Sequence, residues 1–401
     1  MTVTGSTPPE DEHRSTRSTR RRGSGPGSGG SGCVFLDHES SAAGDGDGIR
    51  MTADTAEGPL RHISVLELAA AHRIVDRGKR LIAVDLRHAE GRALLLDLVS
   101  SADVLVEGFR PGVMERLGLG PQPCLERRPR LVYARLTGFG RAGPWSERPG
   151  HDLGFCALSG ALALTGPADG APLPAANAVA DMGGGGLMLA MGVIAALLEA
   201  ERGGAGQVVD TSMVAGAASL LSIVLGLRAS GLWSDRRGTN LLDGGAPYYA
   251  TYRCSDERYV AVAALEEPFY RALVEALGID SRALAWRDDP GQWPLLRRLL
   301  ATAFARRPRD DWAAELPPDA CVVPVLELGE AVSGSAYTVH AGIPQPVPGP
   351  HFGRTPAGIS RPAPEAGQHT AEVLASYGVP QTRVETLAAQ GVICRERQAA
   401  S

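Results

Sequence analysis

The sequence predicts an α/β protein, with a Rossmann-like parallel sheet in a large domain and a smaller α/β domain after it. Short apolar runs at residues 63–68, 81–86, 104–107 and 131–136 have the length and composition of buried strands. A helical pattern at residues 91–99 separates two of these runs. Such alternation of strands and helices is typical of a parallel sheet with helices on its faces.

The large domain is predicted to occupy residues 51–225. Residues 187–230 are mostly helical in pattern, with a polar break at residues 202–207. The apolar run 187–198 follows four glycines at 183–186 and is shorter than the roughly 20 residues that cross a bilayer. We therefore expect a buried helix here and no membrane partner.

A small domain is predicted at residues 226–330. Two strand-like runs within residues 250–262 surround a polar turn, which is a hairpin pattern. The remaining residues, 331–401, are rich in proline and glycine at first, and we expect them to return and pack on the large domain. The helical patterns expected in these two segments are residues 268–277, 295–306 and 370–377.

Charge and composition exclude several classes of function. Residues 1–50 include a basic run at 15–22 and a glycine–serine run at 23–32, so they are predicted to form a disordered tail. The chain carries a formal net charge of -5 over 401 residues, which argues against nucleic acid as a partner. Its single lysine, Lys79, stands in a charged stretch, so we expect it at the surface and not as a catalytic base.

The cysteines give no sign of a metal site or a disulfide scaffold. The six residues are far apart and form neither a CxxC motif nor a cysteine–histidine cluster, so no metal is expected. The N-terminus also lacks the apolar core of a signal peptide. These features favour a reducing, cytoplasmic location.

An ordered series of long sequence blocks resembles the family III CoA-transferases, also called the CaiB/BaiF family. The resemblance extends over about residues 60–394 and is greatest to the α-methylacyl-CoA racemase branch. The blocks are residues 102–120 (ADVLVEGFRPGVMERLGLG), 129–143 (PRLVYARLTGFGRAG), 150–160 (GHDLGFCALSG), 179–197 (VADMGGGGLMLAMGVIAAL), 206–214 (GQVVDTSMV) and 240–252 (NLLDGGAPYYATY).

The resemblance implies proton exchange at the α-carbon of a 2-methylacyl-CoA thioester, with one acid/base group on each face of that carbon. His151 would serve one face, because imidazole titrates near neutrality, and Asp181 the other. Glycines follow Asp181, and we expect their N–H groups to stabilise an enolate oxygen. Glu266 is implied to orient His151. Asp152 would assist His151 or bond to local backbone.

The resemblance also implies that residues 106–110 contact the nucleotide of coenzyme A. This loop follows a strand, where α/β sheets commonly bind ligands. Guanidinium groups suit phosphate oxygens, which favours Arg110 and Arg116 as phosphate contacts over the alternative that they are ordinary surface residues. Coenzyme A, as part of the substrate, is the only cofactor expected. The implied contacts are Val106, Glu107, Gly108, Arg110 and Arg116.

The chain departs from the family near its beginning. The family opens with strand, helix and strand, then an arginine that contacts coenzyme A, whereas here residues 64–69 lead almost directly to residues 77–86. Either residues 1–60 supply a substitute, or stability and affinity for coenzyme A are reduced. The segment between residues 332 and 344 is also short.

Two other functions remain open at this point. A CoA-transferase would use Asp181 as a nucleophile that carries the acyl group, and it would need no histidine at position 151. His151 and Glu266 together favour the racemase. A CoA-binding homologue with reduced or lost activity is the third possibility. The resemblance further implies an interlocked homodimer.

Overall fold

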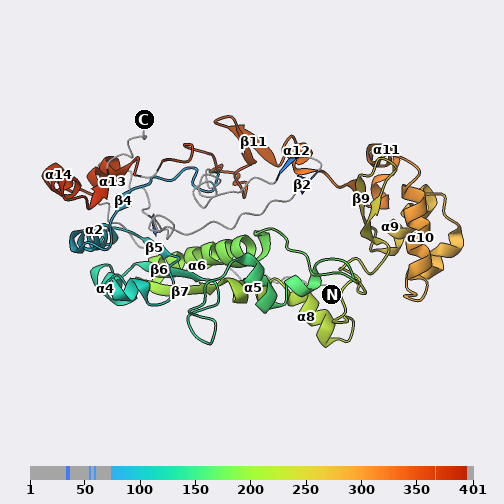
Figure 1. Cartoon of the computed structure of the whole chain (residues 1–401), viewed down its shortest axis with the longest axis horizontal. Helices are drawn as coiled ribbons and strands as arrows, with labels where there is room; N and C mark the ends of the chain where they lie inside the picture. The colour runs from blue at the N-terminus through green and yellow to red at the C-terminus, as the bar shows by residue number, and fades with distance from the viewer. Residues whose placement is uncertain (1–32, 37–53, 56–57, 60–73, 366, 395–401) are drawn as a thin grey trace, which may run out of the picture. The chain divides into compact units, whose positions relative to one another are not determined.

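The computed structural model describes residues 33–36, 54–55, 58–59, 74–365 and 367–394 (Figure 1). The expected strand at residues 63–68 and most of the predicted tail lie outside these residues. Within them, the α/β class is confirmed. The short elements not discussed further are β2 (Asp54–Thr55), β3 (Gly58–Pro59), η2 (Leu162–Leu164), η4 (Ser281–Trp286), η5 (Pro318–Ala320), α12 (Leu328–Ala331), and the hairpin β11 (Tyr337–His340) and β12 (Ile343–Pro346).

The main sheet has four parallel strands in the order β1-β5-β6-β7. They are β1 (Cys33–Leu36), β5 (Val104–Glu107), β6 (Val132–Thr137) and β7 (Gln207–Ser212). Strand β5 (VLVE) and the first half of β6 (VYA) are apolar except for Glu107 and are mostly buried, as expected for the centre of a parallel sheet. Helices α2 (Ala89–Val99) and α4 (Pro121–Arg127) contact each other beside it.

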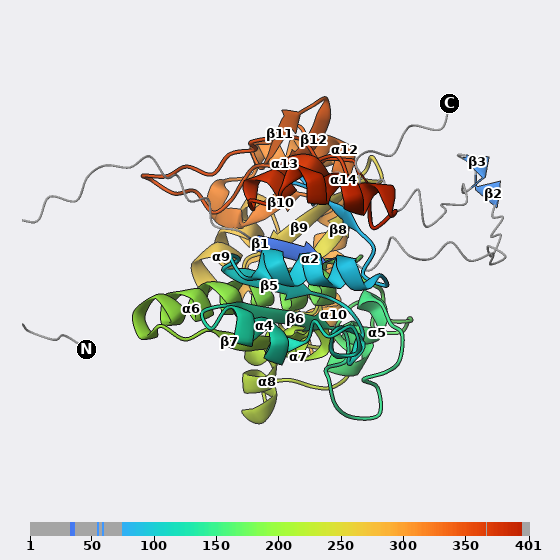
Figure 2. The same cartoon turned by 90° about the vertical axis from the view of Figure 1, so that its left-hand side faces the viewer.

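Strand β1 lies within the segment predicted to be a disordered tail, and the rest of that segment is outside the described residues. Its four residues pair in parallel register with β5, from Cys33 opposite Val104 to Leu36 opposite Glu107 (Figure 2). The apolar sequence CVFL satisfies the backbone groups on one edge of β5, which would otherwise be unpaired. The main sheet therefore extends one strand beyond β5, and this strand comes from the N-terminal region.

Residues 81–86 do not join the parallel sheet, which corrects a second prediction. Only β4 (Ala83–Val84) is a strand, and it pairs antiparallel with β13 (Ile393–Cys394). Next to this pair, α2 shares a buried core with α13 (Thr370–Ser376) and α14 (Gln381–Ala389). The core consists of Leu94, Leu98, Leu374, Val384, Leu387, Val392 and Ile393.

A long helix follows, formed by the π-helical segment η3 (Ala178–Leu187) and α6 (Met188–Gly203). It packs against β6 and β7 on one side. Its opposite side is exposed at Leu187, Met191, Ile194 and Leu198. By length and composition alone its 26 residues could cross a membrane, with 22 % of the apolar window buried. The helix is longer than the apolar run 187–198, and its exposed side corrects the expectation that it is buried.

Strand β7 lies within the stretch that the sequence pattern assigned to helices and a polar break. Its sequence, QVVDTS, has only two apolar residues, and its exposed edge position removes the strong apolar pattern of a central strand. The two helices that follow are α7 (Met213–Ser219) and α8 (Ser222–Ala229).

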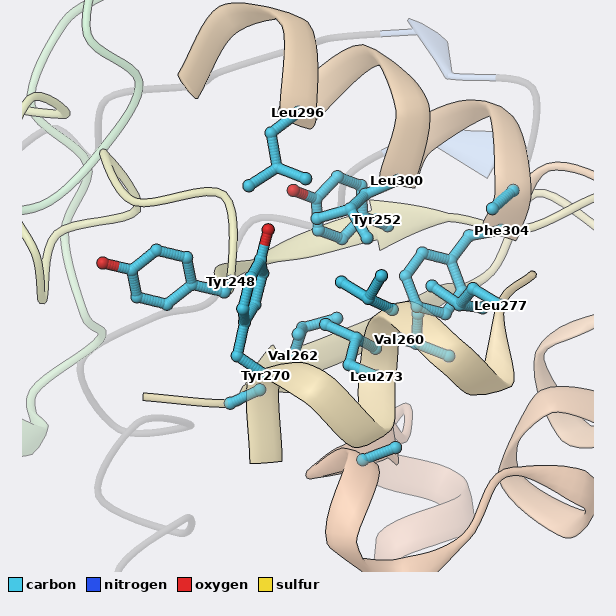
Figure 3. Packing of buried hydrophobic residues seen from close by; sticks show 14 of the residues in the cluster. Tyr248, Tyr252, Val260, Val262, Tyr270, Leu273, Leu277, Leu296, Leu300 and Phe304 are labelled. Atoms are coloured by element: carbon cyan, nitrogen blue, oxygen red, sulfur yellow. The ribbon is translucent and has the colours of Figure 1, made fainter. Parts of the chain in front are cut away.

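The smaller unit is built on an antiparallel sheet in the order β10-β9-β8. The predicted hairpin is confirmed, because β8 (Tyr249–Arg253) pairs with β9 (Tyr259–Ala263), and β10 (Val322–Pro324) pairs with β9. Tyr252 stacks on Phe304 at a centroid distance of 5.3 Å in the buried core shown in Figure 3. The helices around this core are α9 (Glu267–Ala276), α10 (Trp293–Phe304) and α11 (Arg309–Glu315).

The pairing of β1 with β5 predicts a measurable stability difference. A chain that starts at Met51 lacks β1, and we expect its free energy of unfolding to fall by about 2–4 kcal/mol, because several backbone hydrogen bonds are lost. A chain that starts at Gly32 retains β1 and serves as the control. Equal urea midpoints for the two chains would contradict the pairing.

Candidate functional site

The site begins at α5 (Asp152–Ser159), whose N-cap residue is His151. The carbonyl of His151 accepts the N–H groups of Gly154 and Phe155 at 2.9 and 3.2 Å. The imidazole makes no capping hydrogen bond and is exposed. The local fold therefore fixes the backbone of His151 and leaves its ring available to a ligand.

Asp152 links the start of α5 to the start of η3. Its carboxyl group is 5 % exposed, and Oδ2 accepts the N–H groups of Ala180 at 2.8 Å and Asp181 at 3.0 Å. The Cys156 thiol donates to Oδ1 at 3.3 Å. Neither of the expected roles is seen, since Asp152 binds backbone 28 and 29 residues away and not local backbone or His151. Asp152 positions Asp181.

Asp181 lies in the first turn of η3 and not at its N-cap, which is Asn177. Burial raises the pKa of the Asp181 carboxyl, and the negative charge of Asp152 raises it further. The nearby His151 acts in the opposite direction and lowers it. The structure thus brings His151, Asp152 and Asp181 together, as the sequence suggested. A carboxyl with a raised pKa exchanges protons more readily near neutral pH.

The glycines after Asp181 serve packing, which corrects the expected oxyanion role. Gly184 and Gly185 are buried, and a Cβ atom on Gly184 would lie 2.4 Å from the backbone nitrogen of Ala217. A Cβ on Gly216 would lie 1.7 Å from the carbonyl oxygen of Gly184. These glycines allow η3 to approach the backbone of α7 closely. Their backbone is part of a helix packed against a helix.

Glu266 belongs to the smaller unit. It is the exposed N-cap residue of α9, and its carbonyl accepts the N–H of Tyr270 at 3.0 Å. The guanidinium of Arg287 donates to the carbonyl of the preceding Leu265. Among the described residues, no hydrogen bond joins Glu266 to His151, so the orienting role stays a prediction.

The loop after β5 presents its residues in two directions. Val106 packs with the core, and Glu107 is 2 % exposed and accepts the N–H of Phe109 at 2.8 Å. Gly108 and Arg110 are exposed. A ligand at this loop would therefore meet the guanidinium and the loop backbone, while the Glu107 side chain shapes the turn from inside.

An ion-pair network lies at the same edge of the sheet. Arg135 on β6 donates from Nε to Asp210 on β7 at 2.8 Å and from Nη1 to Glu115 at 3.3 Å. Arg141 donates to the same Glu115 at 2.5 Å. Glu115 lies in α3 (Val113–Arg116), whose last residue, Arg116, is exposed. The network ties the loop after β6 to the helix that follows the β5 loop.

The sequence patterns did not identify Arg135 and Arg141 as parts of the site. Arg135 lies within the run 131–136, which was interpreted only as a buried strand. The register of the sheet places Arg135 between Glu107 on β5 and Asp210 on β7. In the part of the chain that the structure describes, no three His, Cys, Asp or Glu side chains gather as they would around a metal ion.

Comparison with known proteins defines the class. Residues 41–370 match the model of CoA-transferase family III, and the chain belongs to this family. It is 41 % identical to the alpha-methylacyl-CoA racemase of Mus musculus over 334 residues, which cover 81 % of this chain and 88 % of the mouse protein. Identity to the alpha-methylacyl-CoA racemase of Homo sapiens is 40 % over 328 residues, with 80 % and 86 % covered.

A solved structure agrees with the fold. The crystal structure of a CAIB/BAIF family protein from Brucella suis superposes with a TM-score of 0.67 at 27 % identity. The superposition covers 77 % of this chain and 84 % of that protein. The α/β architecture described above is therefore that of the family.

The bridge made by Asp152 predicts different results for two variants. Asp152→Asn keeps an acceptor oxygen for the N–H groups of Ala180 and Asp181, whereas Asp152→Ala leaves a buried N–H without a partner. We expect Asp152→Ala to lower the free energy of unfolding by about 1–3 kcal/mol more than Asp152→Asn. Urea unfolding measures this difference, with the exposed Asp169→Asn as the control.

The Asp152→Asn variant also tests how the charge of Asp152 affects the pKa of Asp181. Asp152→Asn removes a negative charge that raises the pKa of Asp181, so this pKa should fall in the variant. Carboxyl carbon NMR follows the titration. An unchanged pKa would contradict the proximity of the two carboxyl groups.

Glu107 predicts a pH-dependent stability. Burial raises the pKa of its carboxyl to about 6 from an ordinary 4.5, so the folded protein binds this proton more tightly than the unfolded chain. The contribution of Glu107 to the free energy of unfolding should fall by about 2 kcal/mol as the pH rises through this range. Glu107→Gln has no such titration, so the stability difference between variant and wild type should change by this amount between about pH 4 and pH 7. A constant difference in urea unfolding would contradict the burial of the charge.

Proposed function

We propose that this protein is an acyl-CoA racemase that exchanges the α-proton of a 2-methylacyl-CoA. The observation that carries the proposal is the convergence of two proton-transfer groups, His151 and Asp181, at the starts of two helices that Asp152 ties together. The alpha-methylacyl-CoA racemases of mouse and human, which resemble this chain over most of its length, support the choice of reaction.

In this reaction the α-carbon loses one proton and gains another. One group removes the α-proton, which leaves an enolate of the thioester, and the other group returns a proton from the opposite face. His151 must be neutral to act as a base, and Asp181 must be protonated to act as an acid in the same turnover. Burial raises the pKa of Asp181, which favours its protonated form. The opposite stereoisomer reverses the two roles.

The enolate oxygen requires hydrogen-bond donors, and the start of α5 offers them. The first intrahelical donors there are Gly154 and Phe155, which bond to the carbonyl of His151. The N–H groups of Asp152 and Leu153 precede them, at a helix N-terminus that favours negative charge. At η3 the equivalent N–H groups of Ala180 and Asp181 already bind Asp152. We therefore assign the oxyanion donors to α5.

The proposal extends to cofactor, location and assembly. Proton transfer between two side chains needs no cofactor beyond the coenzyme A of the substrate. Cys124, Cys156, Cys254 and Cys321 are free thiols, which supports a cytoplasmic location. The exposed stripe of Leu187 on η3 and Met191, Ile194 and Leu198 on α6 supports a homodimer, because large exposed apolar patches commonly mark protein–protein contacts.

A transferase reaction at the same site is the competing function. The Asp181 carboxylate makes no hydrogen bond through its side chain within the described residues, so it could also attack a thioester carbonyl. The acyl group would then form a mixed anhydride with Asp181 while coenzyme A leaves. His151 has no part in that step, and its position beside Asp181 supports the racemase instead.

Incubation with a 2-methylacyl-CoA in deuterated water tests the proposal. The wild-type protein should introduce deuterium at the α-carbon of both stereoisomers. His151→Ala and Asp181→Asn should each reduce exchange by at least about 100-fold, each chiefly from one isomer and not the same one, because each removes the base on one face. Chiral analysis of the recovered thioester measures the exchange.

Two outcomes would reject the racemase. Equal losses from both isomers in both variants would show that His151 and Asp181 have only structural roles. An acyl group trapped on Asp181 by hydroxylamine, together with transfer of coenzyme A to an added carboxylate, would establish the transferase.

A further inference from the structure

Four side chains, three from the loop between β6 and α5 and one from α5 itself, form a continuous stack from the core to the surface. Phe155, which is 5 % exposed, meets Phe139 edge to face at 4.8 Å. Phe139 lies 5.7 Å from Trp145, and the guanidinium of Arg148 lies 4.3 Å above the Trp145 ring. Trp145 is 40 % exposed, so part of its ring is accessible to a ligand.

The backbone around the stack is fixed. A Cβ atom on Gly138 would lie 2.3 Å from the Phe155 ring, and one on Gly150 would lie 2.7 Å from the Phe139 ring. The two glycines at the ends of the loop therefore admit the two phenylalanines. The N–H of Arg148 donates to the carbonyl of Trp145 at 2.9 Å, which closes a turn beneath the exposed pair.

The stack is held next to the loop expected to bind the nucleotide. The ion pair between Arg141 and Glu115 joins this loop to α3, and strands β5 and β6 are neighbours whose following loops share one edge of the sheet. Exposed Arg110 and Arg116 belong to the β5 side of that edge. Cationic groups for phosphates and a flat surface for a base thus lie on adjoining loops.

We propose that Trp145 and Arg148 form the platform on which the adenine ring of the acyl-CoA substrate stacks. This inference rests on the proposed function for the identity of the ligand. The Arg148 guanidinium lies over the Trp145 ring, and purines stack on both arginine and aromatic surfaces.

Binding of coenzyme A and of adenosine 3′,5′-bisphosphate to the full-length protein tests the platform by calorimetry. Trp145→Ala should weaken both ligands about tenfold, and Trp145→Phe, which keeps a ring, only about twofold. Arg148→Lys should weaken both about fivefold, because an ammonium retains the charge but cannot stack. Phe352→Ala, at an exposed phenylalanine outside the site, is the control and should bind as the wild type does.

A thioester that lacks the adenosine separates this role from a structural one. The KM of deuterium exchange for 2-methylacyl-CoA should rise in Trp145→Ala, with kcat and the KM for 2-methylacyl-pantetheine unchanged. Equal effects on both substrates, or wild-type affinity in Trp145→Ala or Arg148→Lys, would overturn the platform while exchange by the wild-type protein still upheld the racemase. If the wild-type protein shows no exchange, weaker binding of adenosine 3′,5′-bisphosphate in Trp145→Ala would support the platform and reject the racemase.

Discussion

The carboxyl group of Asp152 is the contact on which the arrangement of the site depends. Asp152 is the first residue of α5, and its carboxyl group accepts the N–H groups of Ala180 and Asp181 in the first turn of η3. His151 and Asp181 lie on these two segments, which are far apart in the sequence and are joined by the Asp152 hydrogen bonds. A buried carboxylate that accepts two N–H groups is directional, so it fixes both the distance between the helix starts and their orientation. The electrostatic effect on Asp181 is a consequence of the same bridge.

The sequence predicted the central elements of the fold well and the peripheral ones poorly. Residues 104–106 and 132–134 form apolar runs without a polar residue, so they predict buried strands even without knowledge of their neighbours. Strand β7 and strand β4 have weaker patterns, because an edge strand is partly exposed and a two-residue strand has no period. Pairing between β4 and β13 joins segments about 300 residues apart, and no local signal reports it. Strand β1 was missed because its apolar run is short and surrounded by polar sequence.

For the site, the sequence indicated which residues matter but not what each one does. Family blocks and residue chemistry were sufficient to select His151, Asp152 and Asp181, and the structure gathers them. The bonding of Asp152 could not be foreseen, since its partners are backbone groups and every residue has those. Four glycines in a row are equally compatible with ligand binding and with helix packing, and only the position of α7 decides between them. Glu266 begins a helix of the smaller unit, and its role beside His151 stays a prediction.

The contact between Gly184 and Gly216 determines how precisely the helix that carries Asp181 is positioned. Side chains adjust by changing rotamers, so a distance set by side chains can drift as neighbouring residues are replaced. Here backbone meets backbone, and the spacing between η3 and α7 is given by the radii of main-chain atoms. The helix that carries Asp181 therefore rests on a surface that cannot repack, and substitutions elsewhere in the core can accumulate without moving it.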